Sequence, residues 1–162
     1  MRVLIVSDTH RVNENYFRAV DKEKPFDLVI HCGDAEGAEY SLMSYAETDF
    51  EVVGGNNDFF TSLPKERVLN IRGNRIFVTH GHFYQVNAGV ERLAEEAAER
   101  GCSMAFFGHT HIPFMSEVNG VLLVNPGSLT YPRQFGRVPT YMVMEIDGYG
   151  KARFKQCSIV EE

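Results

Sequence analysis

The sequence predicts an α/β fold built from two mixed β-sheets, and two patterns in the chain lead to this prediction. Within the first sixty residues, a short apolar run, a polar loop and a helical segment follow one another repeatedly, which is typical of parallel β-α-β units. The second half contains pairs of strand-like segments separated by turn residues, the pattern of antiparallel hairpins. Two sheets packed face to face, with the helices outside, accommodate all of these segments.

The first half alternates strands with helices. Residues 15–22 place Phe17 and Val20 on one face of a helix that Pro25 ends, and residues 37–45 form a second helical segment. Short apolar runs bounded by polar loops predict buried strands between these helices. These predicted strands are 3–6, 28–30 and 51–53.

The second half is rich in hairpin signals. Residues 72–74, the dipeptide Asn119-Gly120 and residues 147–150 are turns between apolar segments, and Asn-Gly is a strong short hairpin signal. Residues 89–100 form the clearest amphipathic helix, and Gly101 stands where a C-terminal cap is expected. The predicted strands here are 67–71, 75–79, 104–107, 114–118, 121–125, 140–146 and 152–156.

Composition restricts the class of protein. The chain has 162 residues, of which 44% are hydrophobic and 23% charged, and it shows no linker, repeat or low-complexity segment, so we expect one domain over residues 1–162. The net charge of −6 argues against a stable complex with long nucleic acid, which usually requires a basic face. A small anionic substrate held by metal ions remains compatible with this charge.

The cysteines and the apolar segments bear on the cellular compartment. Cys32, Cys102 and Cys157 are an odd number without C-x-x-C spacing, so we expect small buried hydrophobes and a reducing cytosol. The first apolar run, residues 3–6, is too short for a signal-peptide core or a membrane span. The expected location is therefore the cytoplasm, without a membrane partner.

Polar side chains that can bind metals follow the predicted strands, and five of the six histidines are among them. If neighbouring strands end together, these groups meet at one edge of the protein. Their mixture of carboxylate, imidazole and amide suits Mn, Fe, Co, Ni or Zn better than Mg or Ca, and their number fits two ions about 3.5–4 Å apart. The candidates are Asp8, His10, Asp34, Asn56, His80, His82, His109 and His111.

Each candidate also has a structural interpretation when it is taken alone. Asp8 is a plausible helix cap, Asp34 a turn residue, and residues 56–58 a plain turn. His31 lies beside an apolar run, so we expect it in the core or supporting a ligand rather than binding metal. The joint pattern favours a metal site, because two strand-terminal His-x-His pairs in a chain of this length are unlikely accidents.

The ordered motifs resemble those of the calcineurin-like metallophosphoesterase superfamily, and in particular its small YfcE-like phosphodiesterase branch. The resemblance extends from Met1 to about Glu145, and the combined motif is highly specific. The residues that carry it are Asp8-x-His10, Gly33-Asp34, Gly55-Asn56-x-Asp58, His80-Gly81-His82, Gly108-His109-x-His111 and Asn125-Pro126-Gly127-Ser128.

The resemblance implies a four-layer α/β/β/α sandwich with two metal ions at the sheet edges. Mn and Ni are the metals implied first, while Fe, Co and Zn stay open. By motif position, Asp34 bridges the two ions. The other ligands are Asp8, His10 and His111 for one ion and Asn56, His80 and His109 for the second.

Two residues depart from the family pattern. Asn57 stands where relatives have His or Cys acting on the leaving group, and an amide is no useful general acid near neutral pH. This favours esters with good leaving groups and leaves protonation to water or to a residue such as His82. Arg11 stands where relatives often have Gly, and it either grips a phosphate or points to solvent.

The implied activity is metal-dependent hydrolysis of a small phosphodiester. The net charge of such a site is about +1, which matches a singly charged diester. This sum counts two divalent ions, the carboxylates of Asp8 and Asp34 and a bridging hydroxide. Two bound ions would supply a hydroxide as the attacking group. In this hypothesis His82, Asn57 and Arg11 would stabilise the phosphoryl oxygens and Asp58 would orient a ligand.

Two other functions stay open at this point. One is a non-enzymatic scaffold of the same fold, as in the retromer subunit, although retention of every expected ligand argues for catalysis. The other is a nuclease. A homodimer or higher homo-oligomer is also open, because aromatic residues near the motifs suit either a substrate wall or a dimer contact. These aromatic residues are Phe59, Phe60, Phe83, Tyr84, Tyr131 and Phe135.

Overall fold

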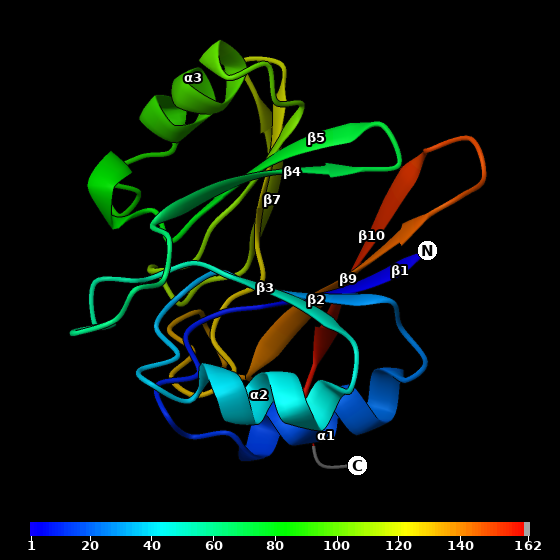
Figure 1. Ribbon diagram of the computed structural model, residues 1–162. Helices are drawn as coiled ribbons and strands as arrows, with labels where there is room; N and C mark the ends of the chain where they lie inside the picture. Colours follow the sequence, from blue (N-terminus) through cyan, green and yellow to red (C-terminus); the bar gives the residue numbers. More distant parts are fainter. Residues whose placement is uncertain (161–162) are drawn as a thin grey trace.

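A computed structural model describes residues 1–160 and contains two five-stranded sheets packed face to face (Figure 1). The first sheet has the order β10 (Ala152–Ser158), β9 (Thr140–Ile146), β1 (Arg2–Val6), β2 (Leu28–His31) and β3 (Asp49–Val52). The second has the order β4 (Glu66–Ile71), β5 (Asn74–Thr79), β6 (Met104–Phe106), β8 (Val121–Asn125) and β7 (Phe114–Val118).

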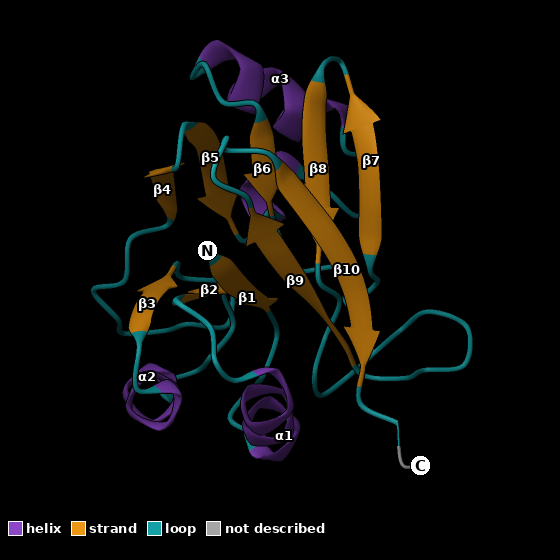
Figure 2. Ribbon diagram, turned by 90° about the vertical axis from the view of Figure 1, so that its right-hand side faces the viewer, coloured by secondary structure: helices purple, strands orange, loops and turns teal. Residues whose placement is uncertain are grey.

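The helices cover the outer faces of the two sheets. Helices α1 (Glu14–Glu23) and α2 (Glu39–Ala46) lie against the first sheet, and α3 (Glu91–Glu99) lies against the second (Figure 2). Both sheets are mixed. In the first, β1, β2 and β3 run parallel, and β9 is antiparallel to both β1 and β10. In the second, β5, β6 and β8 run parallel, and the edge strands β4 and β7 are antiparallel to their neighbours. The predicted four-layer α/β/β/α sandwich is therefore confirmed.

Three apolar clusters hold the layers together. The central cluster lies between the sheets and joins Val3 and Ile5 of β1 to Val78 and Phe106 of the second sheet. A second cluster packs α1 and α2 on the first sheet, and a third packs α3 on the second. Because alternate side chains of a strand point to opposite faces, β1 contributes to the first two clusters in turn, with Leu4 beneath the helices.

The predicted elements are all present, with boundaries that differ by at most two residues. One detail of α1 was wrong: Tyr16, Ala19 and Val20 form its buried face, whereas Phe17 is only partly buried. Phe17 packs instead on Tyr45 of α2, with ring centroids 4.2 Å apart, so it belongs to the seam between the two helices.

A short 3-10 helix, η1 (His82–Tyr84), was not predicted. It begins after Gly81, whose φ of 108° favours glycine, and the apolar period of so short a segment carries no helical signal. Cys32 and Cys102 are buried and Cys157 is partly buried, as free thiols. Within residues 1–160, no helix combines the length and the apolar character that crossing a bilayer requires.

A buried carboxylate joins α1 to the first sheet. Glu23 accepts a hydrogen bond from the Tyr141 hydroxyl of β9 at 2.7 Å, and its other oxygen pairs with the Arg2 guanidinium. Burial alone would raise the pKa of Glu23, but the hydrogen bonds from Tyr141 and Arg2 outweigh burial and lower this pKa. The carboxylate is therefore ionised and strengthens both contacts.

We expect Tyr141→Phe to lower the free energy of unfolding by about 1.5–3 kcal/mol, because a buried hydrogen bond to a charged group is lost. Urea unfolding measures this change. Tyr149→Phe is the matched control, since Tyr149 is fully exposed, and it should leave the stability unchanged. Equal stability of the wild type and the Tyr141 variant would contradict the role of this contact.

Candidate metal centre

The strand ends bring the candidate ligands together, because neighbouring parallel strands stop in register. Val6 of β1 pairs with His31 of β2, which pairs with Val52 of β3. In the second sheet Val78 of β5 pairs with Phe106 of β6. The loops that follow these strands carry all of the predicted ligands and meet at one edge of the sandwich.

Backbone hydrogen bonds join these loops directly. The Asp8 amide donates to the Gly33 carbonyl at 3.0 Å, and the Gly108 amide donates to the His80 carbonyl at 3.0 Å. The first bond lies within one sheet edge and the second within the other. Each pair of ligand loops is therefore fixed by main-chain contacts before any side chain is considered.

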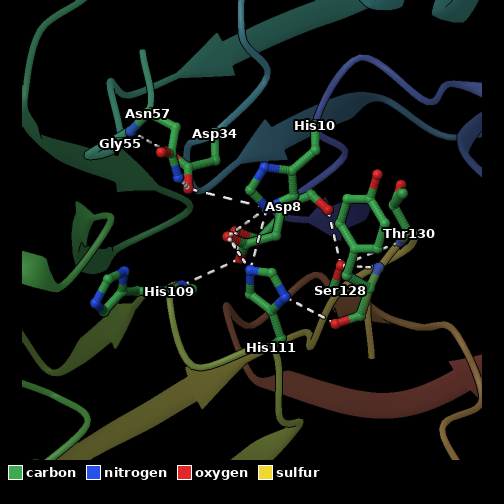
Figure 3. Close-up of polar contacts among 12 residues, drawn as sticks. Asp8, His10, Asp34, Gly55, Asn57, His109, His111, Ser128 and Thr130 are labelled. Atoms are coloured by element: carbon green, nitrogen blue, oxygen red, sulfur yellow. Dashed lines mark hydrogen bonds and ion pairs between the residues drawn. The ribbon is translucent and has the colours of Figure 1, made fainter. Parts of the chain in front are cut away.

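One group of candidate ligands consists of Asp8, His10 and His111 (Figure 3). The Asp8 Oδ1 atom lies 3.1 Å from His111 Nε2 and 3.5 Å from His10 Nε2. The two Nε2 atoms lie 3.1 Å apart. Donor atoms at such separations fit neighbouring ligands of a single ion, since metal–nitrogen bonds are about 2.0–2.1 Å long.

A second group consists of Asp8, Asp34 and His80, all of them buried. His80 Nε2 lies 3.3 Å from Asp34 Oδ2 and 3.7 Å from Asp8 Oδ1. His109 lies beside it, with its ring centroid 5.2 Å from that of His80, and its Nδ1 is 3.0 Å from Asn56 Oδ1. Seven predicted ligands thus lie in one continuous cluster, in which Asp8 belongs to both groups.

Two buried atoms in this cluster have no hydrogen-bond partner. They are Asp8 Oδ1 and His80 Nε2, which face each other at 3.7 Å. A buried carboxylate oxygen without a partner costs considerable free energy, so such atoms require an explanation. A cation between them satisfies both at once, and the carboxylate, imidazole and amide donors match a divalent transition metal.

The imidazole rings are oriented from behind by backbone carbonyls. His80 Nδ1 lies 2.7 Å from the Cys32 carbonyl oxygen, and His111 Nδ1 lies 2.7 Å from that of Tyr131. With Nδ1–H donating to a carbonyl, the Nε2 lone pair of each ring points into the cluster. This arrangement is the usual support of a metal-bound histidine.

The Asp34 carboxylate is held by the loop after β3. Asn57 donates two hydrogen bonds to this carboxylate, each at 2.9 Å. Its backbone N–H donates to Oδ1, and its side-chain Nδ2 donates to Oδ2. Asp58 in turn accepts backbone N–H bonds from Asp34, Glu36 and Gly55 at 2.8, 2.6 and 2.6 Å. Asp58 therefore fastens the Asp34 loop to the Asn56 loop through backbone amides, and its own carboxylate is not part of either candidate metal group.

Electrostatics favour ionised carboxylates in this cluster. Burial alone would raise the pKa of Asp8, but His80, His10 and His111 outweigh burial and hold it well below its usual range. Burial likewise opposes ionisation of Asp34, whose contacts with His80 and Asn57 nevertheless lower its pKa to about 2. Both carboxylates are therefore ionised.

Five of the seven predicted ligands adopt a left-handed backbone, which side chains other than glycine rarely do. Their φ angles lie between 48° and 68°. Such conformations cost of order 1–3 kcal/mol each and persist where the surroundings impose them, often at functional sites. These residues are Asp8, His10, Asp34, His109 and His111.

The other predicted functional residues lie around the cluster. His82 begins η1, and its ring centroid lies 6.0 Å from that of His109; burial, helped by His80 and His109, lowers its pKa to about 4. Arg11 is exposed, and its Nε donates to the Glu36 carbonyl at 2.5 Å. His31 is buried and contacts Thr9 Oγ1 at 3.0 Å, which agrees with a supporting position in the core.

The sequence does not predict several hydrogen bonds that support the ligand loops. Asn125 Nδ2 donates to the Gly108 carbonyl and to Thr110 Oγ1, both at 3.0 Å, and so shapes the loop that carries His109 and His111. Ser128 Oγ donates to the Asp8 carbonyl at 2.8 Å. In the sequence, residues 125–128 stand out only as part of a family motif, and the carbonyls of Cys32 and Tyr131 have no sequence signal because every residue has a carbonyl.

Comparison with known proteins agrees with this geometry. The family model described as the calcineurin-like phosphoesterase superfamily domain matches residues 1–149. A probable metallophosphoesterase of Bacillus subtilis, YsnB, is 34% identical over 91% of this chain and 85% of its own length. The phosphodiesterase MJ0936 of Methanocaldococcus jannaschii is 27% identical over 78% of this chain and 83% of its own length.

Solved structures share the fold. A predicted phosphoesterase from Streptococcus pneumoniae superposes with a TM-score of 0.80 at 28% identity and covers 98% of this chain and 97% of its own. Vps29 from Entamoeba histolytica, crystallised with Zn²⁺, gives a TM-score of 0.75 at 23% identity, over 98% of this chain and 99% of its own. The predicted family is thus confirmed, and the chain belongs to the calcineurin-like phosphoesterase superfamily.

Proposed function

We propose that this protein is a metal-dependent phosphodiesterase that hydrolyses a small phosphodiester at a centre of two divalent transition-metal ions. The observation that carries the proposal is the pair of buried, unpartnered atoms, Asp8 Oδ1 and His80 Nε2, which face each other among imidazoles and carboxylates. Mn and Ni are the metals we expect first, with Fe, Co and Zn as alternatives.

The ligands divide between two ions in this proposal, and Asp34 is the residue they share. Bound ions would supply an activated water and positive charge for the phosphoryl oxygens. The chain itself provides the fixed frame, because backbone carbonyls orient His80 and His111 and two hydrogen bonds from Asn57 hold Asp34. We assign Asp8, His10 and His111 to one ion and Asn56, His80 and His109 to the other.

Residues at the rim complete the proposed site. His82 can donate a hydrogen bond to a phosphoryl oxygen as a neutral imidazole. Arg11 has its Nε bound to the Glu36 carbonyl, which anchors the guanidinium on the loop after β2, and we propose that its terminal nitrogens contact the substrate phosphate. Asn57 and Asp58 act through the Asp34 loop, which they hold in place.

Charge and acid–base chemistry favour diesters. Two divalent ions with two carboxylates and one hydroxide would leave a net charge of about +1, which suits a singly charged diester better than a doubly charged monoester. Asn57 cannot protonate a leaving group, so esters with acidic leaving groups should react fastest. The name of the relative MJ0936, a phosphodiesterase, supports the same substrate class.

A scaffold function is the alternative, suggested by the fold that the chain shares with Vps29. The predicted ligands lie in one cluster, of which Asp8, Asp34, His80 and His111 are buried. This favours catalysis over the alternative, because unpartnered buried polar atoms are costly in a protein that only docks partners. Hydrolysis and metal binding distinguish the two functions.

Asp34→Asn and His80→Ala should each abolish metal-dependent hydrolysis of bis(p-nitrophenyl) phosphate, lowering kcat/KM at least about a thousandfold, since each removes a proposed ligand. Release of p-nitrophenolate by the manganese-loaded proteins measures this. Asp49→Asn, a change at the exposed start of β3, is the control and should retain activity. Full activity in both folded site variants would contradict the assignment of Asp34 and His80 as metal ligands.

The wild-type chain should bind two Mn²⁺ ions, and chelation should remove both the metal and the activity. Equilibrium dialysis with elemental analysis gives the stoichiometry. At a free metal concentration of a hundred times Kd, each site should add about 2.7 kcal/mol to the free energy of unfolding. A stoichiometry of one ion, or hydrolysis that survives complete removal of metal, would refute the two-ion proposal.

Gly108→Ala should weaken metal binding, because a Cβ at this position would lie 2.0 Å from Ser7 Oγ and 2.6 Å from Asp8 Oδ2. We expect overpacking to cost about 1–3 kcal/mol of stability and the displaced Asp8 to raise the Kd for Mn²⁺. Calorimetric titration checks both effects. Gly148→Ala is the control, since its Cβ would meet nothing within 4 Å; equal metal affinity in both variants would show that Asp8 tolerates displacement.

A further inference from the structure

An exposed aromatic ring lies directly beside the cluster of candidate ligands. Tyr131 is 54% exposed, and its ring centroid lies 5.4 Å from that of His10, with an interplanar angle of 53°. The tilt means that the two rings do not stack in parallel. No other ring or cation within residues 1–160 packs on Tyr131, so most of its apolar surface meets solvent.

The backbone holds Tyr131 rigidly in this exposed position. Its amide donates to Ser128 Oγ at 2.8 Å, and its carbonyl accepts the bond from His111 Nδ1 at 2.7 Å. The Arg133 amide donates to the His111 carbonyl at 3.0 Å on the other side. A residue whose backbone is fixed before a ligand arrives loses little backbone entropy when it binds one.

The other exposed aromatic residues near the motifs differ from Tyr131. Phe83 already packs within the chain, since the His82 ring lies 4.1 Å from its ring and Lys65 Nζ lies 5.0 Å from its centroid. Phe135 lies in the same loop as Tyr131 and is fully exposed, yet it has no ring contact with a candidate ligand among the described residues. Among the aromatic residues that the structure describes, Tyr131 is the exposed one whose ring contacts one of the seven predicted ligands.

The position of Tyr131 distinguishes the two ends of the cluster. Asn57 and His109 lie on one side of Asp8, while Ser128 and Thr130, which precede Tyr131, lie on the other (Figure 3). The resemblance to the family implies that the leaving group lies on the Asn57 side, and we adopt this orientation for the substrate. A substituent that stays on phosphorus therefore has the Tyr131 end of the site available to it.

We propose that Tyr131 determines specificity by stacking on a planar ring in the ester group that remains on phosphorus. The preferred substrates are then diesters with an aromatic or nucleobase substituent there, rather than alkyl diesters. This inference rests on the proposed phosphodiesterase function, which it makes more specific. Aromatic pairs are worth enough to change KM severalfold, and stacking tolerates many ring types.

Two diesters with the same leaving group test the proposal. The manganese-loaded wild type, Tyr131→Leu, Tyr131→Phe and Phe135→Leu are assayed with phenyl p-nitrophenyl phosphate and with methyl p-nitrophenyl phosphate. We expect Tyr131→Leu to raise KM about fivefold for the phenyl diester only, and Tyr131→Phe to behave like the wild type. Phe135→Leu is the matched control from the same loop and should change neither diester.

The ratio between the two diesters separates recognition from a merely structural role. If Tyr131→Leu slows both diesters by the same factor, the ring only supports His10, and the proposal is wrong. If it changes neither KM, the ring does not contact substrate, which also overturns the proposal.

A binding measurement keeps this inference separate from the proposed function. Phenyl phosphate and methyl phosphate are titrated calorimetrically into the manganese-loaded wild type and the Tyr131→Leu variant. Failure to hydrolyse either diester contradicts the proposed function, whereas the titration still decides the role of Tyr131. Tighter binding of phenyl phosphate that is lost in the variant supports stacking, and equal binding in both proteins refutes it.

Discussion

The carboxylate of Asp8 is the contact on which the candidate centre depends. It is completely buried, and its Oδ1 atom lies within 3.7 Å of three imidazole nitrogens from three different loops. Its Oδ2 atom accepts hydrogen bonds from Ser7 Oγ and the His109 amide. This one charged group thus contacts loops of both sheets at their shared edge.

That junction explains features that otherwise look costly. Three such features lie around this carboxylate. They are the left-handed backbone at five predicted ligands, the unpartnered atoms of Asp8 and His80, and the close packing of Gly108. Proteins retain such strain where the surrounding structure imposes it and function requires it. The three apolar clusters supply the stability that offsets these costs.

The sequence predicted the fold well because local patterns determine it. The β-branched runs, the Asn119-Gly120 turn and the amphipathic helix before Gly101 each act over a few residues, and the parallel direction of β1, β2 and β3 follows from their crossover helices. The prediction that the ligands meet at one edge of the protein required only that neighbouring strands end together. Their assignment to two ions came from the family resemblance and stays a prediction.

The rest of the site depends on contacts that a sequence does not record. The carbonyls of Cys32 and Tyr131 orient two imidazoles, yet every residue has a carbonyl. The double contact of Asn57 with Asp34 requires the β3 loop to fold over the β2 loop. The burial of Tyr16 in place of Phe17 likewise depends on how α1 and α2 pack together.

The most direct test of the central claim is a crystal structure of the manganese-soaked protein with anomalous diffraction data. Two anomalous peaks about 3.5–4 Å apart, next to Asp8, Asp34 and His80, are the result that the account predicts. Absence of density among these side chains, or metal bound on a different face of the protein, would contradict it.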